Sequence, residues 1–300
     1  MKLAIASTSL LALPTFNQLQ ENGHEVSILF SKPGKARGRG KVNSYNEITS
    51  MLRERNLHVE LTESDSDITN TIISAKIELV VAISYGKLIK RAALAAPKYG
   101  WLNLHFSKLP QYRGAAPVQR AILDGNYNSG ITVFKLDEGM DTGPIYTQSD
   151  FSLHQKNATD ALAEMSSAGS HLVQAAIEMI QSGIEPSAQL GSSSQAPKVD
   201  KAELRIDWSR QSDFPLRQIR AFGDSPGAWS ELDGKKIKIL DARLSKAVGE
   251  PGVILNIEPL IVGLGSGSIE IMEVQAESSR RMLAREWSRG ARIQVGNRFQ

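Results

Sequence analysis

The chain has 300 residues, of which 41% are hydrophobic and 22% are charged, and its formal net charge is +3. This length allows one large or two modest domains, and the composition is that of a soluble globular protein. No apolar run reaches the roughly 20 residues that a membrane helix needs. The absence of cysteine excludes disulfides, thiolate metal sites and cysteine nucleophiles, and it suits the cytoplasm.

The N-terminal stretch, MKLAIASTSLLALPTF, allows two interpretations. A lysine followed by a mostly apolar run resembles a signal peptide. We favour a first β-strand over residues 3–7 and a helix after it, because the next apolar run, EVSILF, follows at the spacing of a βαβ unit.

The first half of the chain alternates strand-like and helix-like segments. The expected strands are short apolar runs at 3–7, 25–30, 58–62, 78–84, 101–105 and 131–136. The expected helices lie at 13–21, 44–55, 66–75, 87–95, 115–123 and 158–181. Continuous apolar strands separated by helices predict an α/β domain with a doubly wound, mostly parallel, Rossmann-like sheet, to which we assign residues 1–183.

A change of composition follows this domain. Residues 184–203 are rich in Ser, Gly, Pro and Gln without periodicity, which is typical of a linker. Beyond it, AWSEL and KKIKILDARL flank an Asp-Gly pair, a strong hairpin signal, and more short strands follow. Residues 204–300 are therefore predicted to form a small, OB-like β-barrel, a class that includes nucleic-acid binders.

Polar side chains stand at the end of the strand WLNLH. Alternation puts Asn103 and His105 on one face, at the carboxyl end where open α/β sheets bind ligands. A lone histidine near a strand end is usually a hydrogen-bonded structural residue. An amide and an imidazole together can instead donate to a developing oxyanion, and the imidazole can move a proton near neutral pH.

Two further segments are candidates for the same site. FSKLPQYRGAAPV, after the strand, is either a stiff connector or the wall of a ligand pocket. DEGMDTGPI, at 137–145, is a surface turn, a metal loop, or a tight loop that presents one carboxylate. It lacks the EF-hand spacing, so we predict no metal and choose Asp141 as the carboxylate that orients His105.

These motifs resemble a known family. NLHFSKLPQYRGAAPVQRAI (103–122) and GITVFKLDEGMDTGPI (130–145) are similar to the formyltransferases that use 10-formyltetrahydrofolate. The resemblance covers nearly the whole chain, with further motifs GRGK (38–41), SYGKLI (84–89), IDWSR (206–210) and IRAFGDSPGAW (219–229). The ending, VQAESSRRMLAREWSRGARIQVGNRF (274–299), is similar to the branch of the family that formylates initiator methionyl-tRNA for translation initiation.

The resemblance implies a role for particular residues. The catalytic trio of the family falls on Asn103, His105 and Asp141. Contacts to the folate co-substrate are implied for Ser107, Lys108, Leu109 and Pro110, and a pterin pocket around Ile83, Tyr85, Gly86 and Leu88. A basic loop is implied to contact the tRNA through Arg37, Arg39 and Lys41. We further expect that the protein binds no metal and no membrane, and that it is a monomer in the cytoplasm.

A few positions depart from the family pattern. Ser7-Thr8-Ser9 replaces Gly-Thr-Pro after the first strand, and Lys90 replaces a proline after the pterin loop. Lys108 replaces a leucine in the folate segment, where it meets the folate glutamate or points to solvent. Ser279-Arg280-Arg281 stands for the usual Gly-Lys-Lys, and the trio is intact.

The expected reaction is acyl transfer, in which the methionyl α-amine attacks the formyl carbon while Asn103 and protonated His105 stabilise the oxyanion. A competing interpretation is a formyltransferase for a small amine, such as an aminosugar nucleotide or glycinamide ribonucleotide. The basic β domain argues against the glycinamide enzyme. A hydrolase that releases formate and a non-catalytic RNA-binding module also compete, and the intact trio argues against the module.

Overall fold

The computed structural model describes residues 1–33, 36–37, 42–43, 45–210 and 213–300. It divides into two compact units. The first unit comprises Met1–Pro117, Asn128–Ser152 and Leu162–Pro197, and the second comprises Val118–Tyr127, Leu153–Ala161 and Lys198–Gln300. The domain boundaries expected from the sequence stay a prediction, although part of the expected linker is counted in the first unit.

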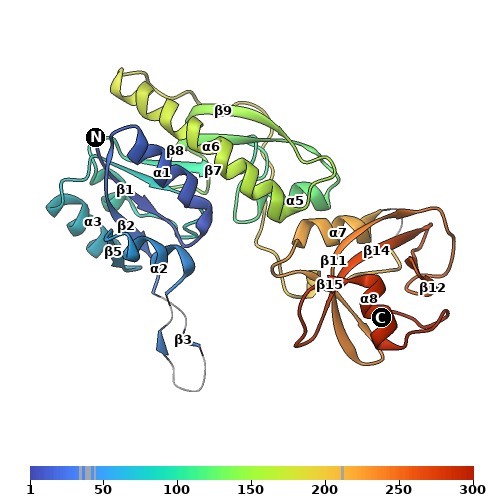
Figure 1. Ribbon diagram of the computed structural model, residues 1–300. Coiled ribbons are helices and arrows are strands. Elements are labelled where there is room, and N and C mark those ends of the chain that lie inside the picture. The colour runs from blue at the N-terminus through green and yellow to red at the C-terminus, as the bar shows by residue number, and fades with distance from the viewer. Residues whose placement is uncertain (34–35, 38–41, 44, 211–212) are drawn as a thin grey trace. The chain divides into compact units, whose positions relative to one another are not determined.

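The first unit is built on a seven-stranded sheet of order β5-β2-β1-β6-β7-β8-β9 (Figure 1). The strands are β1 (Lys2–Ala6), β2 (Glu25–Ser31), β5 (His58–Leu61), β6 (Leu79–Ala82), β7 (Trp101–His105), β8 (Asn128–Lys135) and β9 (Ile145–Ser152). Pairing is parallel from β5 to β7 and antiparallel from β7 to β9. The predicted mostly parallel α/β sheet is confirmed.

Strand β9 was not foreseen from the sequence. Its residues, IYTQSDFS, are half-buried or exposed along their whole length. An edge strand with one open side needs no continuous apolar run, so it lacks the signal that marked the central strands.

The helices of this part of the chain lie close to the predicted ranges. They are α1 (Leu13–Glu21), α2 (Glu47–Glu54), α3 (Asp65–Ser74), α4 (Arg91–Ala95), α5 (Pro117–Leu123) and α6 (Ala158–Gln181), with a 3-10 turn at Leu10–Ala12. Asn46 and Ser64 begin α2 and α3 as N-caps, accepting from the backbone N–H groups of Thr49 and Asp67. Short strands β3 (Ala36–Arg37) and β4 (Val42–Asn43) pair with each other.

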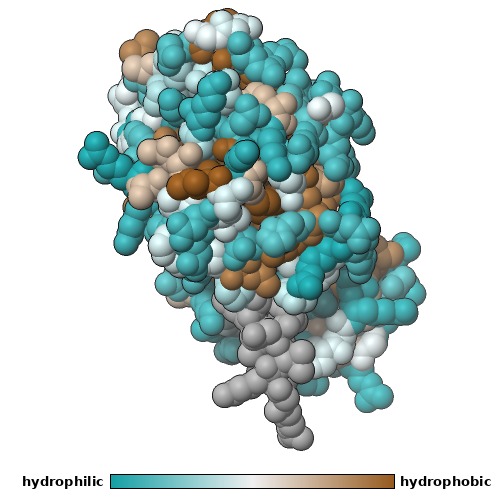
Figure 2. Space-filling model, turned by 90° about the vertical axis from the view of Figure 1, so that its left-hand side faces the viewer, coloured by the Kyte–Doolittle hydropathy of each residue, from teal (hydrophilic) through white to brown (hydrophobic). Residues whose placement is uncertain are grey.

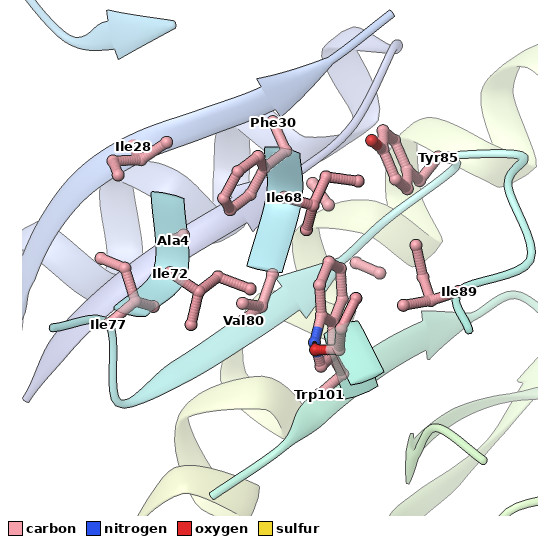
Figure 3. Packing of buried hydrophobic residues seen from close by; sticks show 13 residues of the cluster. Ala4, Ile28, Phe30, Ile68, Ile72, Ile77, Val80, Tyr85, Ile89 and Trp101 are labelled. Atoms are coloured by element: carbon pink, nitrogen blue, oxygen red, sulfur yellow. Dashed lines mark hydrogen bonds between the residues drawn. The ribbon is translucent and has the colours of Figure 1, made fainter. Parts of the chain in front are cut away.

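The central strands of the sheet are buried on both faces. On one face, Phe30 and Trp101 pack with Ile68 and Ile72 of α3 and with the chain around Ile89 (Figure 3). The indole N–H of Trp101 donates to the carbonyl oxygen of Ala93 at 2.8 Å, so the one polar group of this buried ring has a hydrogen-bond partner. On the other face, α6 lies against Leu104: a Cβ on Gly169 would come within 2.6 Å of the leucine side chain.

The second unit is an antiparallel sheet of order β10-β11-β14-β13-β12, with β15 paired to β14. Its elements are β10 (Ala228–Leu232), β11 (Lys235–Ser245), β12 (Ile254–Ile257), β13 (Leu260–Gly263), β14 (Ser268–Ala276), β15 (Met282–Leu283), α7 (Phe214–Phe222), α8 (Ala284–Ala291) and a 3-10 turn at Ala202–Leu204. The turn between β10 and β11 has positive φ at Asp233 and Gly234, which is the hairpin geometry that the sequence predicted.

The last residues of the chain close this sheet. Phe299 donates from its backbone to Gly252, beside β12, and Gln300 exchanges two backbone hydrogen bonds with Glu231 of β10. The two edges are thereby joined, so the predicted small barrel is observed. Helix α7 was not foreseen, because a single amphipathic helix interrupts a sequence otherwise read as strands and turns.

Hydrophilic residues cover most of the surface that Figure 2 shows, and apolar residues gather near the centre of that face. In the described part of the chain, no helix is long and apolar enough to cross a membrane.

Candidate active site

A pocket of about 390 Å³ lies beside the carboxyl ends of β6 and β7. The chain order reverses between β1 and β6, since β2 and β5 lie on one side of β1 and β6 and β7 on the other. Such a reversal leaves a crevice at the strand ends, where open α/β sheets bind ligands. Its walls come from the residues after β6, from the end of β7 and from the loop around Asp141.

The structure brings Asn103, His105 and Asp141 to this pocket. Asn103 is half-buried at the pocket wall, whereas His105 is only 5% exposed. His105 Nε2 lies 2.9 Å from the carbonyl oxygen of Tyr112. A carbonyl can only accept, so Nε2 carries a hydrogen and Nδ1 is the nitrogen that faces Asp141.

Asp141 is held in place by backbone contacts. Its Oδ2 accepts from the backbone N–H of Gly114 at 2.7 Å and lies 3.7 Å from Nδ1 of His105. Asp141 has φ of 54°, a left-handed conformation that aspartate adopts more readily than most residues. Residue 114 must be a glycine for two reasons. Its φ is +128°, and an added Cβ would come within 2.6 Å of the carbonyl oxygen of Ala196.

The pterin loop predicted from the sequence lines the same pocket in part. Tyr85, Gly86 and Leu88 are lining residues, whereas Ile83 is fully buried and does not line the pocket. The loop is tied down by Thr8, which donates to the carbonyl oxygen of Ser84 at 3.0 Å. Burial, with Glu63 and Asp65 nearby, raises the pKa of Tyr85 to about 12, so its hydroxyl stays neutral.

The segment Ser107–Pro110 is not among the residues that line the pocket. Ser107 donates to the carbonyl oxygen of Gln111 at 2.6 Å, and Leu109 is buried. Lys108 points away from the core and pairs with the carboxylate of Asp150. The folate contacts implied for these four residues stay a prediction. In this structure they shape the turn that carries Tyr112.

The residues expected to contact tRNA are only partly described. Arg39 and Lys41 lie outside the described residues, and of Arg37 only the backbone, in β3, is described. Their role stays a prediction.

Some residues of the site were not identified from the sequence. Lys87 and Met140 line the pocket, and Lys87 forms an ion pair of 2.9 Å with Asp65. Leu88 and Met140 are 59% and 58% exposed, which makes the rim of the pocket apolar. Gln189, from the expected linker, donates to the backbone of the Asp141 loop. Among the described residues, no group of three or more His, Asp or Glu side chains could hold a metal ion.

Comparison with known families explains this arrangement. Residues 1–177 match the model of the family described as formyl transferase, and residues 198–292 match its C-terminal domain. The chain belongs to the formyl transferase family. This formyltransferase is 33% identical over 296 residues to the methionyl-tRNA formyltransferase of Arthrobacter sp. (strain FB24), with 97% of each chain covered.

Solved structures share the fold. HypX from Aquifex aeolicus, in complex with tetrahydrofolic acid, superposes with a TM-score of 0.71 at 20% identity. The match covers 96% of this chain and 46% of HypX, so the formyltransferase spans about half of that protein. The N-formyltransferase from Helicobacter canadensis, in complex with folinic acid and dTDP-3-aminofucose, gives a TM-score of 0.67 at 20% identity and covers 94% of this chain and 100% of its own.

Proposed function

We propose that this protein transfers the formyl group of 10-formyltetrahydrofolate to the α-amine of methionyl initiator tRNA, in the cytoplasm. The observation that carries the proposal is the meeting of Asn103, His105 and Asp141 at one pocket, in a chain that matches a methionyl-tRNA formyltransferase over 97% of its length. That the protein acts as a monomer stays a prediction.

The pocket suits a folate ring. Its volume of about 390 Å³ lies in the range of small-molecule sites, and an apolar rim is joined to a few fixed polar groups. Backbone around Tyr85 and Gly86 would hold the donor, with Leu88 and Met140 covering its apolar part. HypX is described as binding tetrahydrofolic acid on the same fold. When bound, the donor supplies the formyl carbon.

The trio supplies what an amine needs to attack that carbon. The amine nitrogen bonds to the formyl carbon, the bond from that carbon to N10 of the folate breaks, and the proton lost by the amine passes to N10, so that the folate leaves as tetrahydrofolate. Negative charge develops on the formyl oxygen, and the amide of Asn103 can donate to it. Nε2 of His105 is occupied by the carbonyl oxygen of Tyr112, so Nδ1, which lies 3.7 Å from Asp141 and is not hydrogen-bonded to it, is the ring nitrogen that would donate. One preorganised donor of this kind is worth about 3–4 kcal/mol in known enzymes. The carboxylate of Asp141 lies 3.7 Å from Nδ1 and orients the ring of His105, while the carbonyl oxygen of Tyr112 fixes Nε2.

The acceptor is inferred from the relatives rather than from the fold. The Helicobacter canadensis structure holds an aminosugar nucleotide, so this architecture can accommodate a small amine. Relatives 33–35% identical over nearly the full chain are methionyl-tRNA formyltransferases, and this favours the tRNA.

The test is to incubate the protein with 10-formyltetrahydrofolate and charged initiator tRNA, and to measure formyl-methionine and free formate. We expect formyl-methionyl-tRNA as the main product. A dTDP-aminosugar and a no-acceptor sample serve as competing conditions. Faster formylation of the aminosugar, or formate release without acceptor, would overturn the proposal.

Binding of the tRNA provides a second test. Contacts from Arg37, Arg39 and Lys41 to phosphates would displace counterions, so affinity should fall as salt rises. We expect the Arg37→Gln, Arg39→Gln, Lys41→Gln triple variant to bind more weakly and with a shallower salt dependence. Unchanged binding would remove these residues from the tRNA surface.

A further inference from the structure

The expected linker contains a segment that is hydrogen-bonded to both loops of the active site. Ser187 exchanges two backbone hydrogen bonds with Ile145, just after the Asp141 loop. Farther along, Arg113 donates to the carbonyl oxygen of Ser194 and accepts from the N–H of Ala196. The segment 187–196 therefore spans from the loop that presents Asp141 to the loop that presents Tyr112 and Gly114.

One side chain joins the two loops directly. The amide nitrogen of Gln189 donates to the backbone carbonyl oxygens of Asp141, at 2.9 Å, and Gly143, at 2.8 Å. Its amide oxygen accepts from Nε and Nη2 of Arg113, at 3.2 and 2.6 Å. The orientation of this amide is unambiguous, because the carbonyls can only accept and the guanidinium can only donate.

These four contacts use the whole hydrogen-bonding capacity of one amide. The neighbouring residues are mostly exposed, so burial of apolar surface does not explain why the chain lies here. The two carbonyls that Gln189 binds belong to the left-handed residue Asp141 and to Gly143, where the loop turns the Asp141 carboxylate toward His105. A misplacement of about 1 Å in such a group can cost 100-fold in rate.

We propose that Gln189 is a positioning residue, which fixes Asp141 against His105 by clamping the Asp141 loop to Arg113. The inference rests on the proposed function for its kinetic readout, but the contacts that it describes do not depend on the identity of the acceptor. Gln189 touches no reacting atom, so its effect is on the geometry of the trio and not on the affinity for either substrate.

Two substitutions at Gln189 separate this role from packing. Gln189→Glu keeps the shape and the contact with Arg113, but it turns an oxygen toward two carbonyl oxygens. Gln189→Met keeps the length and removes every hydrogen bond. Gln195, an exposed glutamine of the same segment, offers the matched controls Gln195→Glu and Gln195→Met.

We expect both Gln189 variants to lower kcat for formyl transfer about tenfold or more, with both KM values within about threefold of wild type. The Gln195 variants should stay within about twofold in all parameters. Wild-type kcat in either Gln189 variant would overturn the inference. If Gln189→Met does not fold, Gln189→Glu decides, since it retains the pairing with Arg113.

Hydrogen–deuterium exchange of the full-length protein gives a readout without substrates. Peptides covering 137–146 should exchange faster in the Gln189 variants than in wild type, and at the wild-type rate in the Gln195 variants. Unchanged exchange would overturn the clamp. Absence of formyl transfer in the wild type would instead overturn the proposed function, and exchange would then decide the inference by itself.

Discussion

The two units of this chain place their polar groups in opposite settings. In the first unit, His105 and Asp141 are nearly buried and each is fixed by a backbone group. In the second unit, charged side chains pair at the surface: Arg243 is 64% exposed beside Glu270, and Arg289 is 67% exposed beside Glu258. Nearly buried polar groups that are fixed by the backbone suit chemistry, whereas ion pairs of solvent-exposed arginines contribute little to stability.

The largest effect should come from the core that supports the pocket. Trp101→Ala removes a fully buried indole, and we expect it to destabilise the first unit by about 3–5 kcal/mol. Hydrogen exchange should increase in β1, β6 and β7 while the barrel strands keep their protection. Equal loss of protection in both units would contradict the view that each has its own core.

Substitutions in the trio should have the next largest effect, and they should change the activation free energy of turnover rather than the free energy of unfolding. Asp141→Asn and Asn103→Ala should each lower kcat at least about 100-fold, close to 2.7 kcal/mol, with little change in unfolding. Asp241→Asn is the matched control, since Asp241 is a carboxylate of the second unit whose pKa is raised by burial. If either trio variant is folded and turns over at a near-normal rate, the substituted residue has no part in the mechanism.

The pocket should also give the first unit a pH dependence at high pH. The pKa of Tyr85 is about 12 in the folded protein and about 10 when the ring is exposed, so the unfolded chain loses this proton first. The contribution of Tyr85 to stability is therefore fully present below about pH 10 and is lost as pH rises through about 12, by about 2.7 kcal/mol at most. Urea unfolding should show that Tyr85→Phe flattens this fall. An unchanged profile would assign it to other groups.

The smallest effect should come from the surface of the barrel. Arg243→Gln removes the two hydrogen bonds between the exposed guanidinium of Arg243 and Glu270, whose side chain is 15% exposed, and we expect a loss of about 1 kcal/mol, reduced further by salt. Thermal unfolding at low and high salt measures it. A loss comparable to that of Trp101→Ala would mean that the surface pairs of the second unit are structural, and the contrast between the units would fail.

Much of the fold could be predicted from the sequence because its signals are local. Continuous apolar runs marked the buried strands, and Asp233-Gly234 marked the hairpin. Strand β9 and helix α7 were not predicted, because their local signals are weak. An edge strand lacks a continuous apolar run, and a short amphipathic helix among strands shows little periodicity.

The site divides in the same way. The two-residue period of a strand determined by itself that Asn103 and His105 share a face, and the tight loop 137–145 singled out Asp141, in agreement with the family motif. Only the tertiary structure decided that Asp141 meets His105 through a left-handed turn held by Gly114. Gln189 could not be predicted, because its four hydrogen bonds reach loops distant in sequence, and a polar segment without periodicity gives no sign of where it binds.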